Sequence, residues 1–439
     1  MIEAQAAVKD NYAHVLVLPA FDEPCNLLDK LLPGDVQNVL VILLINAPDN
    51  LEPDCSEVKR TEALLHAFAS SSVCPRVVCY DAARHVDVLV IDLVSNCKRM
   101  PRRKGIGAIR KLGADIALGL IYDQQVRTPW IFCTDADVRL PEGYFGVPEN
   151  TSADRRKLSA LVLPYRHFVD METDQDIDGL PQTLAELETA SVLYELHVRY
   201  FINRLAWSGS PYAYPALGSL MIISSSHYAM VRGFPSRPAA EDFYLLNKLA
   251  KIGLIGCPNL PVVELQARCS TRVPFGTGPA LTKIIENAER LTYAPQSFAL
   301  LRLFYTELAH LNVLPGSPQE LWTSNFLESP DAGSLLRVMD KIGFGQFVAQ
   351  QLQHCKTPGR LLRSIHEWFD AFRVLKFLHA ARDLDHPDIP VMEALAEVLA
   401  EIPYESGSTP HDYLAFLCNL EQSEPQYRGL GRYSEVAPP

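Results

Sequence analysis

Two pairs of acidic residues in this chain could bind a metal ion or move a proton. Asp135 and Asp137 stand one residue apart, directly after the apolar run Trp130–Cys133. Two carboxylates at a strand end can hold a hard cation such as Mn²⁺ or Mg²⁺ and leave coordination positions for phosphate oxygens. Glu241 and Asp242 form the second pair, where we expect a helix to begin and where a carboxylate is electrostatically favoured.

A third acidic segment, Pro19-Ala20-Phe21-Asp22-Glu23, follows the apolar run His14–Leu18. We expect Asp22 to cap a helix over 24–32, with Pro24 in its first turn. Each acidic group also has an ordinary explanation as a helix cap, a chance Asp-x-Asp or helix-start electrostatics. The order and spacing of all three together favour a functional site.

Two basic segments could meet an anion. Arg103 and Lys104 precede Gly105, and a position beside a helix start suits phosphate. Further along, a glycine-containing basic segment is formed by Arg268, Ser270, Arg272 and the run Gly276-Thr277-Gly278. This segment is consistent both with a loop that closes over a diphosphate and with a plain surface loop.

The elements that must position these residues alternate between strand and helix. This alternation predicts an α/β fold around a mainly parallel sheet, in which ligands bind beyond the carboxyl ends of the strands. We expect strands over 14–18, 39–45, 86–93, 130–133 and 219–223. We expect helices over 57–69, 105–121, 184–206 and 240–252.

The strand signal disappears after about residue 295. Helical patterns separated by Gly and Pro follow over 297–311, 333–353, 360–382, 391–402 and 411–420. The sequence therefore predicts two domains, an α/β domain over 1–295 and an all-helical domain over 296–439.

Composition excludes several classes of protein. The 439 residues carry 40 Lys and Arg against 52 Asp and Glu, a net charge of −12, which is unsuited to non-specific binding of nucleic acid. The first twelve residues show no secretory signal, and we find no apolar run long enough to span a bilayer. Ten cysteines without a CxxC pair indicate reduced thiols, so we expect a cytoplasmic protein.

The order of the motifs resembles the glycosyltransferase family 2 enzymes of GT-A fold, a Rossmann-like architecture. Members show a Pro-x-Tyr-Asn-Glu segment, a basic residue before a Gly/Ala-rich helix start, an Asp-x-Asp motif and a later Glu-Asp pair. The resemblance covers roughly residues 14–280. A narrower resemblance to a soluble bacterial subgroup rests on Lys104–Leu118, Tyr194–Tyr214, Glu241–Lys248 and Arg272–Gly278.

The resemblance implies a metal-dependent, inverting transfer of a hexose from a nucleotide-diphosphate sugar to a hydroxyl acceptor. Asp242 would be the general base, supported by Glu241. Asp135 and Asp137 would hold Mn²⁺ or Mg²⁺ and the sugar ribose, with Asp137 the direct metal ligand. The remaining residues implied to bind the nucleotide sugar are Pro19, Ala20, Phe21, Glu23, Asn46, Arg103, Lys104 and Arg272. By family habit UDP is expected before GDP.

Some features depart from the family and leave alternatives open. Asp22 replaces the usual Asn and Phe21 the usual Tyr, while the Gln-x-x-Arg-Trp motif of processive synthases is absent. A sugar-nucleotide nucleotidyltransferase is one alternative, although its glycine-rich first loop is missing here. A non-catalytic nucleotide-sugar-binding protein of the same fold is another. The helical domain could cover the acceptor, form a homo-oligomer or bind a partner protein.

Overall fold

The computed structural model describes residues 2–8, 10–68, 75–95, 99–101, 103–151, 154–170, 176–177, 180–181, 183–269, 276–400, 407–422 and 426–429. The chain forms two compact units. The first comprises Met1–Leu184, Ala216–Ala280 and Gln422–Tyr427, and the second comprises Ala185–Pro215, Leu281–Glu421 and Arg428–Pro439. Because these units interleave along the chain, they do not coincide with the single division predicted near residue 295, which remains a prediction about folding.

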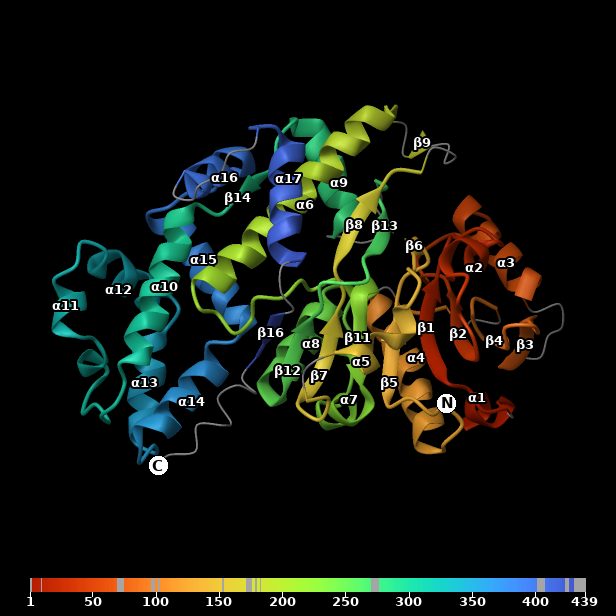
Figure 1. Ribbon diagram of the computed structural model, residues 1–439, viewed down its shortest axis with the longest axis horizontal. Coiled ribbons are helices and arrows are strands. Elements are labelled where there is room, and N and C mark those ends of the chain that lie inside the picture. Colours follow the sequence, from red (N-terminus) through yellow and green to blue (C-terminus); the bar gives the residue numbers. More distant parts are fainter. Residues whose placement is uncertain are drawn as a thin grey trace. The chain divides into compact units, whose positions relative to one another are not determined.

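A nine-stranded sheet organises the first unit (Figure 1). In spatial order its strands are β16 (Gln426–Arg428), β12 (Leu254–Cys257), β7 (Leu158–Val162), β11 (Met221–Ser224), β5 (Trp130–Cys133), β1 (His14–Ala20), β2 (Val39–Asn46), β4 (Val86–Leu93) and β3 (Arg76–Asp81). β1 pairs in parallel with β2 and β5, while β11 and β3 run antiparallel to their described partners. The predicted α/β class with a mainly parallel sheet is confirmed.

Strands β5 and β2 in the middle of the sheet are almost entirely apolar, as expected for parallel strands that are buried on both faces. All four residues of β5 are buried, and so is every residue of β2 except Asn46. Helix α4 (Gly105–Tyr122) packs against β1, β2 and β5, and α8 (Glu241–Ile252) packs against β7 and β12. The other helices of this unit are α1 (Ile2–Ala7), α2 (Leu27–Leu31), α3 (Ser56–Phe68), α5 (Val147–Asn150) and α7 (Ser225–Met230).

Gly113 sets how closely α4 approaches the sheet. A Cβ atom at this position would lie 2.5 Å from Val17 Cγ1 and 2.7 Å from Leu44 Cδ1. The absence of a side chain therefore lets α4 lie directly on β1 and β2. This close packing sets the distance between α4 and the sheet, and so the position of the other α4 side chains relative to the carboxyl ends of the strands.

A small three-stranded sheet forms next to the predicted Asp-x-Asp motif. Its strands are β6 (Val138–Arg139), β13 (Val263–Gln266) and β8 (Tyr165–Phe168), with β13 in the middle. β13 runs antiparallel to β6, and the Gln266 N–H donates to the Asp137 carbonyl at 2.9 Å. The residues after Gln266 are thereby carried alongside the segment 135–137.

The second unit is almost entirely helical, which confirms the predicted helical C-terminal region. Its helices include α6 (Leu184–Trp207), α9 (Thr277–Asn287), α10 (Pro295–Ala309), α11 (Ser324–Leu327), α12 (Ala332–Lys341), α13 (Phe344–Leu352), α14 (Pro358–Trp368), α15 (Ala371–Leu384), α16 (Val391–Leu399) and α17 (Pro410–Gln422). The two-residue strands β14 (Leu291–Thr292) and β15 (Ile389–Pro390) pair with each other.

Two helices predicted as continuous are each divided in two. The stretch 333–353 breaks between α12 and α13 at Gly343, whose φ of 78° lies outside the helical region and suits glycine. The stretch 360–382 breaks between α14 and α15 at Asp370, whose carboxylate caps α15 by accepting the Arg373 N–H at 3.2 Å. Local capping chemistry at these two residues outweighs the helical apolar pattern.

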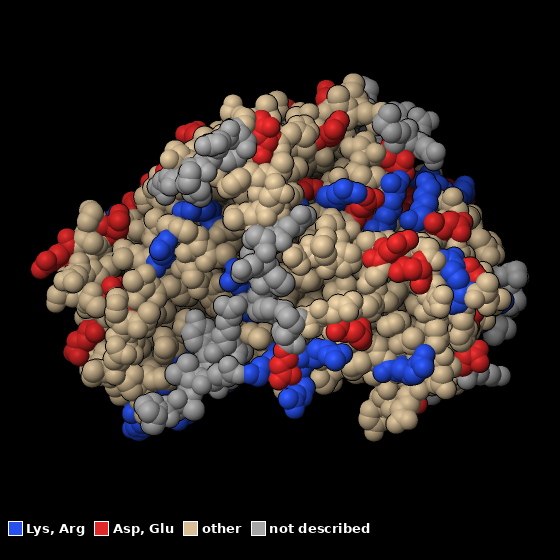
Figure 2. Space-filling model, viewed as in Figure 1, with Lys and Arg blue, Asp and Glu red and all other residues tan. Residues whose placement is uncertain are grey.

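The surface is charged with both signs. On the face in Figure 2, acidic and basic side chains lie close together rather than in separate fields. Arg166 and Arg139 both pair with Glu264, for example. Among the helices that the structure describes, none combines the length and apolar character needed to cross a membrane.

Candidate functional site

The carboxyl ends of β1, β2 and β5 lie at one edge of the sheet. In the parallel ladders Ala20 is opposite Ile45 and Val17 is opposite Cys133, so the three strands end within a few residues of one another. The segments 19–23 and 134–137 and the side chain of Asn46 therefore emerge together, as the sequence predicted. β1 has β2 on one side and β5 on the other, and such a switch point is where α/β sheets bind ligands.

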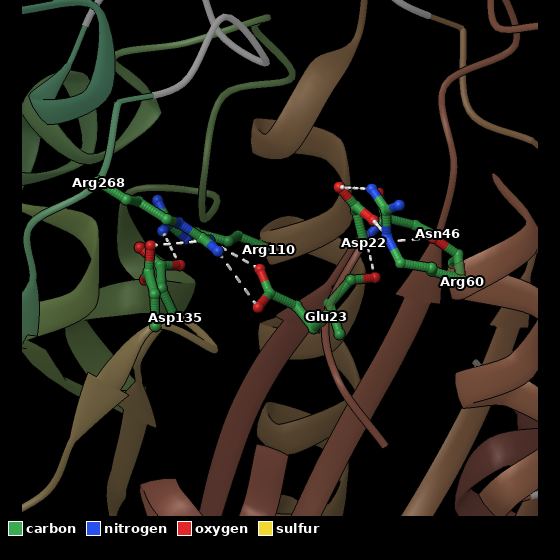
Figure 3. A network of polar contacts seen from close by, with 10 residues as sticks. Asp22, Glu23, Asn46, Arg60, Arg110, Asp135 and Arg268 are labelled. Atoms are coloured by element: carbon green, nitrogen blue, oxygen red, sulfur yellow. Dashed lines mark hydrogen bonds and ion pairs between the residues drawn. The ribbon is translucent and has the colours of Figure 1, made fainter. Parts of the chain in front are cut away.

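Arg268 connects two of the acidic segments at this edge (Figure 3). Its Nη2 atom lies 2.7 Å from Glu23 Oε1 and 2.9 Å from Asp137 Oδ2. Glu23 is 7% exposed, and a carboxylate this deeply buried needs a partner. The β13–β6 pairing brings Arg268 to this position, since it fixes Gln266 against Asp137 two residues earlier.

Arg110 connects the other two acidic positions. It projects from α4, is 5% exposed, and ion-pairs through Nη2 with Asp135 Oδ1 and through Nη1 with Glu241 Oε1. Glu241 is buried at the first position of α8. The Asp-x-Asp motif and the Glu-Asp pair, about a hundred residues apart in sequence, thus meet on one guanidinium group.

Asp242 has an altered acidity. Burial, followed by the negative charge of Glu241, raises the pKa of Asp242 from 3.8 to about 7, against the opposing effect of Arg110. One carboxylate oxygen accepts the Phe243 N–H at 2.7 Å. A carboxyl group with a pKa near neutrality can exchange a proton at physiological pH, which suits an acid or base.

Asp22 does not cap a helix, and that prediction is wrong. Helix α2 begins only at Leu27, whereas Asp22 has a φ of 60° and turns towards α3. Its carboxylate accepts Arg60 Nε at 2.5 Å and its N–H donates to Thr61 Oγ1 at 3.0 Å. Two side chains from α3 therefore set the conformation of the turn after β1.

Asn46 ties the end of β2 to the end of β1. Its Nδ2 group donates to the carbonyls of Ala20 and Leu44, at 3.1 and 3.2 Å. Pro19 and Ala20 are buried as the last residues of β1, and the side chain of Phe21, just beyond, is half-buried. The loop after β1 thus begins at a strand end that is buried and hydrogen-bonded to β2.

Arg103 and Lys104 lie exposed directly before α4. The first turn of α4 is in contact with the backbone of residues 235–238. The Gly107 N–H donates to the Arg237 carbonyl at 3.2 Å, and a Cβ on Gly105 would lie 2.4 Å from Pro238 Cα. These contacts lie beside the exposed side chains of Arg103 and Lys104, whose approach to a phosphate remains a prediction.

Arg272 lies outside the described residues, as do Ser270 and the rest of 270–275. Of the basic segment singled out in the sequence, Arg268 is the described member that reaches the carboxylates. The ligand-binding roles predicted for Arg272 and for the other site residues remain predictions.

Arg110 and Arg60 were missed by the sequence analysis. Arg110 lies on the face of α4 formed by the buried small residues Gly107, Gly113 and Ala114. A charged residue on a buried helix face requires a partner, because an isolated charge is costly there. That signal could have found Arg110, whereas Arg60 lies on an exposed part of α3 and gives no such signal.

The opposite edge of the sheet holds another group of polar residues. Asp10, His85 and Asp87 place one ligand atom each within 4.8 Å of one another, the one such trio that could hold a metal among the described residues. Asp87 follows the first residue of β4, and its carboxylate accepts the Tyr12 hydroxyl at 2.6 Å. A cavity of about 590 Å³ lined by Asn38 and Arg127 also lies at this edge. Neither feature belongs to the carboxylate site.

No family model matches this chain, and no curated protein matches it. Among solved structures, the chain is similar to mannosyltransferase PcManGT from Pyrobaculum calidifontis in complex with GDP-Man and Mn²⁺. The match covers 96% of this chain and 92% of that chain, at 12% sequence identity and a TM-score of 0.28. A TM-score this low is not evidence for a shared function, so no residue role is transferred from that enzyme.

Proposed function

We propose that this protein is a glycosyltransferase that moves a sugar from a nucleotide-diphosphate sugar to a hydroxyl acceptor. One observation carries the proposal. Asp135 and Asp137 at the end of β5 meet Glu241 and Asp242 at the start of α8, with one arginine bridging the two pairs. Metal-assisted glycosyl transfer requires carboxylates that can bind a cation and, beside them, a carboxyl group whose pKa is near neutrality.

The Asp135–Asp137 pair suits a divalent cation. Its side chains are 34% and 28% exposed, so solvent can reach both, and carboxylate oxygens are ligands that Mn²⁺ and Mg²⁺ prefer. Each carboxylate is paired with an arginine, which limits the local negative charge when no cation is bound. A bound cation would neutralise the charge that develops on the departing diphosphate.

Asp242 is the proposed base. In its ionised form it accepts the proton of the acceptor hydroxyl while that oxygen bonds to the anomeric carbon of the donor sugar. The bond from this carbon to the diphosphate oxygen breaks, and its electron pair leaves with the nucleoside diphosphate. A single displacement of this kind inverts the anomeric configuration.

The donor is proposed to lie over the ends of β1 and β2. Asp22 and Glu23 border that region, and the two are held by Arg60 and Arg268 respectively (Figure 3). Arg103 and Lys104 directly precede α4, and both side chains are exposed. We propose that they approach the diphosphate. UDP is the first nucleotide to test and GDP the second.

The direct test is incubation of the purified protein with UDP- and GDP-sugars and Mn²⁺, together with a panel of hydroxyl acceptors. Release of free nucleoside diphosphate, lost in Asp242→Asn, would support the proposal. Release of pyrophosphate from a nucleoside triphosphate and a sugar phosphate would favour a nucleotidyltransferase instead. Tight binding of a nucleotide sugar with no turnover on any acceptor would favour a non-catalytic binding protein.

A further inference from the structure

Arg110 has two partners that belong to different functional segments. Nη2 pairs with Asp135 Oδ1 on the β5 side, and Nη1 pairs with Glu241 Oε1 on the α8 side. Arg110 is 5% exposed and Glu241 is 2% exposed. A planar guanidinium group can serve two carboxylates in a fixed geometry, which a single ammonium cannot do.

The guanidinium is held in place by the backbone around it. A Cβ atom on Gly218 would lie 2.0 Å from Arg110 Nη1 and 2.4 Å from Cζ, so glycine at 218 leaves the space that the guanidinium fills. About one turn further along the helix, Gly113 has no side chain and so allows α4 to lie close to the sheet. The guanidinium thus has little room to move away from its two carboxylates.

The ion pair between Arg110 and Glu241 distinguishes Glu241 from its neighbour Asp242. Glu241 is buried and forms an ion pair with Arg110 through Oε1. Asp242 makes no ion pair within the described part of the chain, and one of its oxygens accepts the Phe243 N–H. Of the two neighbouring carboxyl groups, Asp242 is therefore the one available to an incoming hydroxyl.

We propose that Arg110 is a positioning residue for the transfer reaction, fixing the start of α8, and with it Asp242, relative to the Asp135 carboxylate. This inference rests on the proposed function and deepens it. In this role Arg110 would contact neither the donor nor the acceptor. It acts by holding the proton acceptor at a set place relative to the cation-binding pair, and errors of about 1 Å in such an arrangement can cost about 10²-fold in rate.

Two kinds of variant test the inference. Arg110→Gln removes the charge and both ion pairs, whereas Gly218→Ala keeps every charge and displaces the guanidinium. Gly34→Ala is the matched control, because a Cβ at Gly34 meets nothing within 4 Å. Arg156→Gln is the control for loss of an arginine, since the Arg156 side chain is 91% exposed and pairs only with Asp154 among the described residues.

The measurements are kcat and donor KM in the nucleoside-diphosphate release assay, with circular dichroism to confirm folding. We expect Arg110→Gln to lower kcat by about 10²-fold and Gly218→Ala by at least about 10-fold, with donor KM changed less than about threefold. Arg110→Lys should fall between the parent and Arg110→Gln, and both controls should match the parent. If Arg110→Gln does not fold, the Gly218→Ala and Gly34→Ala pair decides.

The outcomes separate this inference from the proposed function. A parent protein that releases no nucleoside diphosphate from any donor means that the proposed function itself is wrong. A parent protein that is active while folded Arg110→Gln or Gly218→Ala keeps the parental kcat means that Arg110 is not a positioning residue. A loss that appears only in donor KM also overturns the inference, because it would assign Arg110 to donor binding.

Discussion

Arg268 Nη2 lies 2.9 Å from Asp137 Oδ2, within the carboxylate pair proposed to bind the cation. A guanidinium and a divalent cation compete for the same carboxylate oxygens. If the pair binds a cation as proposed, Arg268 would oppose cation binding when no nucleotide is present, and it would supply positive charge to a bound diphosphate. This double relationship predicts opposite effects on the two ligands.

Arg268→Gln should bind Mn²⁺ more tightly and UDP less tightly than the parent protein. A part-buried ion pair of about 1 kcal/mol corresponds to about a fivefold increase in Mn²⁺ affinity. Titration calorimetry with Mn²⁺ alone, then with UDP at saturating Mn²⁺, measures both effects. Arg166→Gln is the control, since the Arg166 side chain is 67% exposed and pairs with Glu264. Weaker Mn²⁺ binding in Arg268→Gln would contradict the competition.

Asp137→Ala should remove most of the metal dependence of nucleotide binding. Even outer-shell partners of metal ligands contribute about 10–100-fold to metal affinity, so loss of a ligand should cost at least that much. The comparison is UDP and GDP affinity by calorimetry in Mn²⁺ and in EDTA, for the parent and the variant. Equal affinities of the parent protein in both buffers would rule out the cation role of Asp137.

The sequence predicted which acidic segments meet, because parallel strands align their carboxyl ends. Asp135, Asp137, Glu241 and Asp242 follow strands or begin a helix in ways that local patterns reveal. The arginines between them depend on pairing across long sequence separations. Arg268, for example, is brought to Asp137 by the pairing of β13 with the two-residue strand β6, which has no readable periodicity.

The strands β3, β7, β8, β12 and β13 were also missed. β7 has the sequence Leu-Ser-Ala-Leu-Val and is buried throughout, so it shows no alternation of apolar and polar residues. β12 contains Gly256, a residue that weakens any strand pattern. Both segments form strands because they pair with neighbouring strands in the sheet. The sequence of a single segment does not reveal its pairing partners.

The transfer reaction should depend on pH through Asp242. Burial and Glu241 raise the pKa of Asp242 to about 7, and only the ionised carboxylate can accept a proton. The rate constant kcat/KM should therefore rise with pH through about 7 and level off above it. The effect of Asp242 on the free energy of unfolding has the opposite sign. Because its pKa is raised in the folded protein, protonated Asp242 stabilises the fold at low pH, and this stabilisation is lost as pH rises through about 7. Profiles of kcat/KM and of thermal unfolding between pH 5 and 9 check both, and a flat kcat/KM profile would contradict the first.

Gly113→Ala should destabilise the protein, because the new methyl group would overlap Val17 and Leu44 beneath α4. Overpacking of this kind typically costs about 1–3 kcal/mol. Urea unfolding measures the difference from the parent, and Gly34→Ala, whose new methyl group meets nothing, is the matched control. Equal stability of Gly113→Ala and the parent would mean that α4 does not lie as close to β1 and β2 as described.

The assignment of Asp242 as the base is the centre of this account, and the turnover of Asp242→Asn tests it most directly. Removal of a positioned base should lower kcat by about 10²–10⁴. The nucleotide-sugar affinity should stay within about threefold of the parent in calorimetry, since the proposed donor contacts lie elsewhere, and Glu241→Gln should be milder in kcat. Nucleoside-diphosphate release by Asp242→Asn at more than about a tenth of the parental rate would contradict the assignment, because such a loss falls short of what a general base contributes.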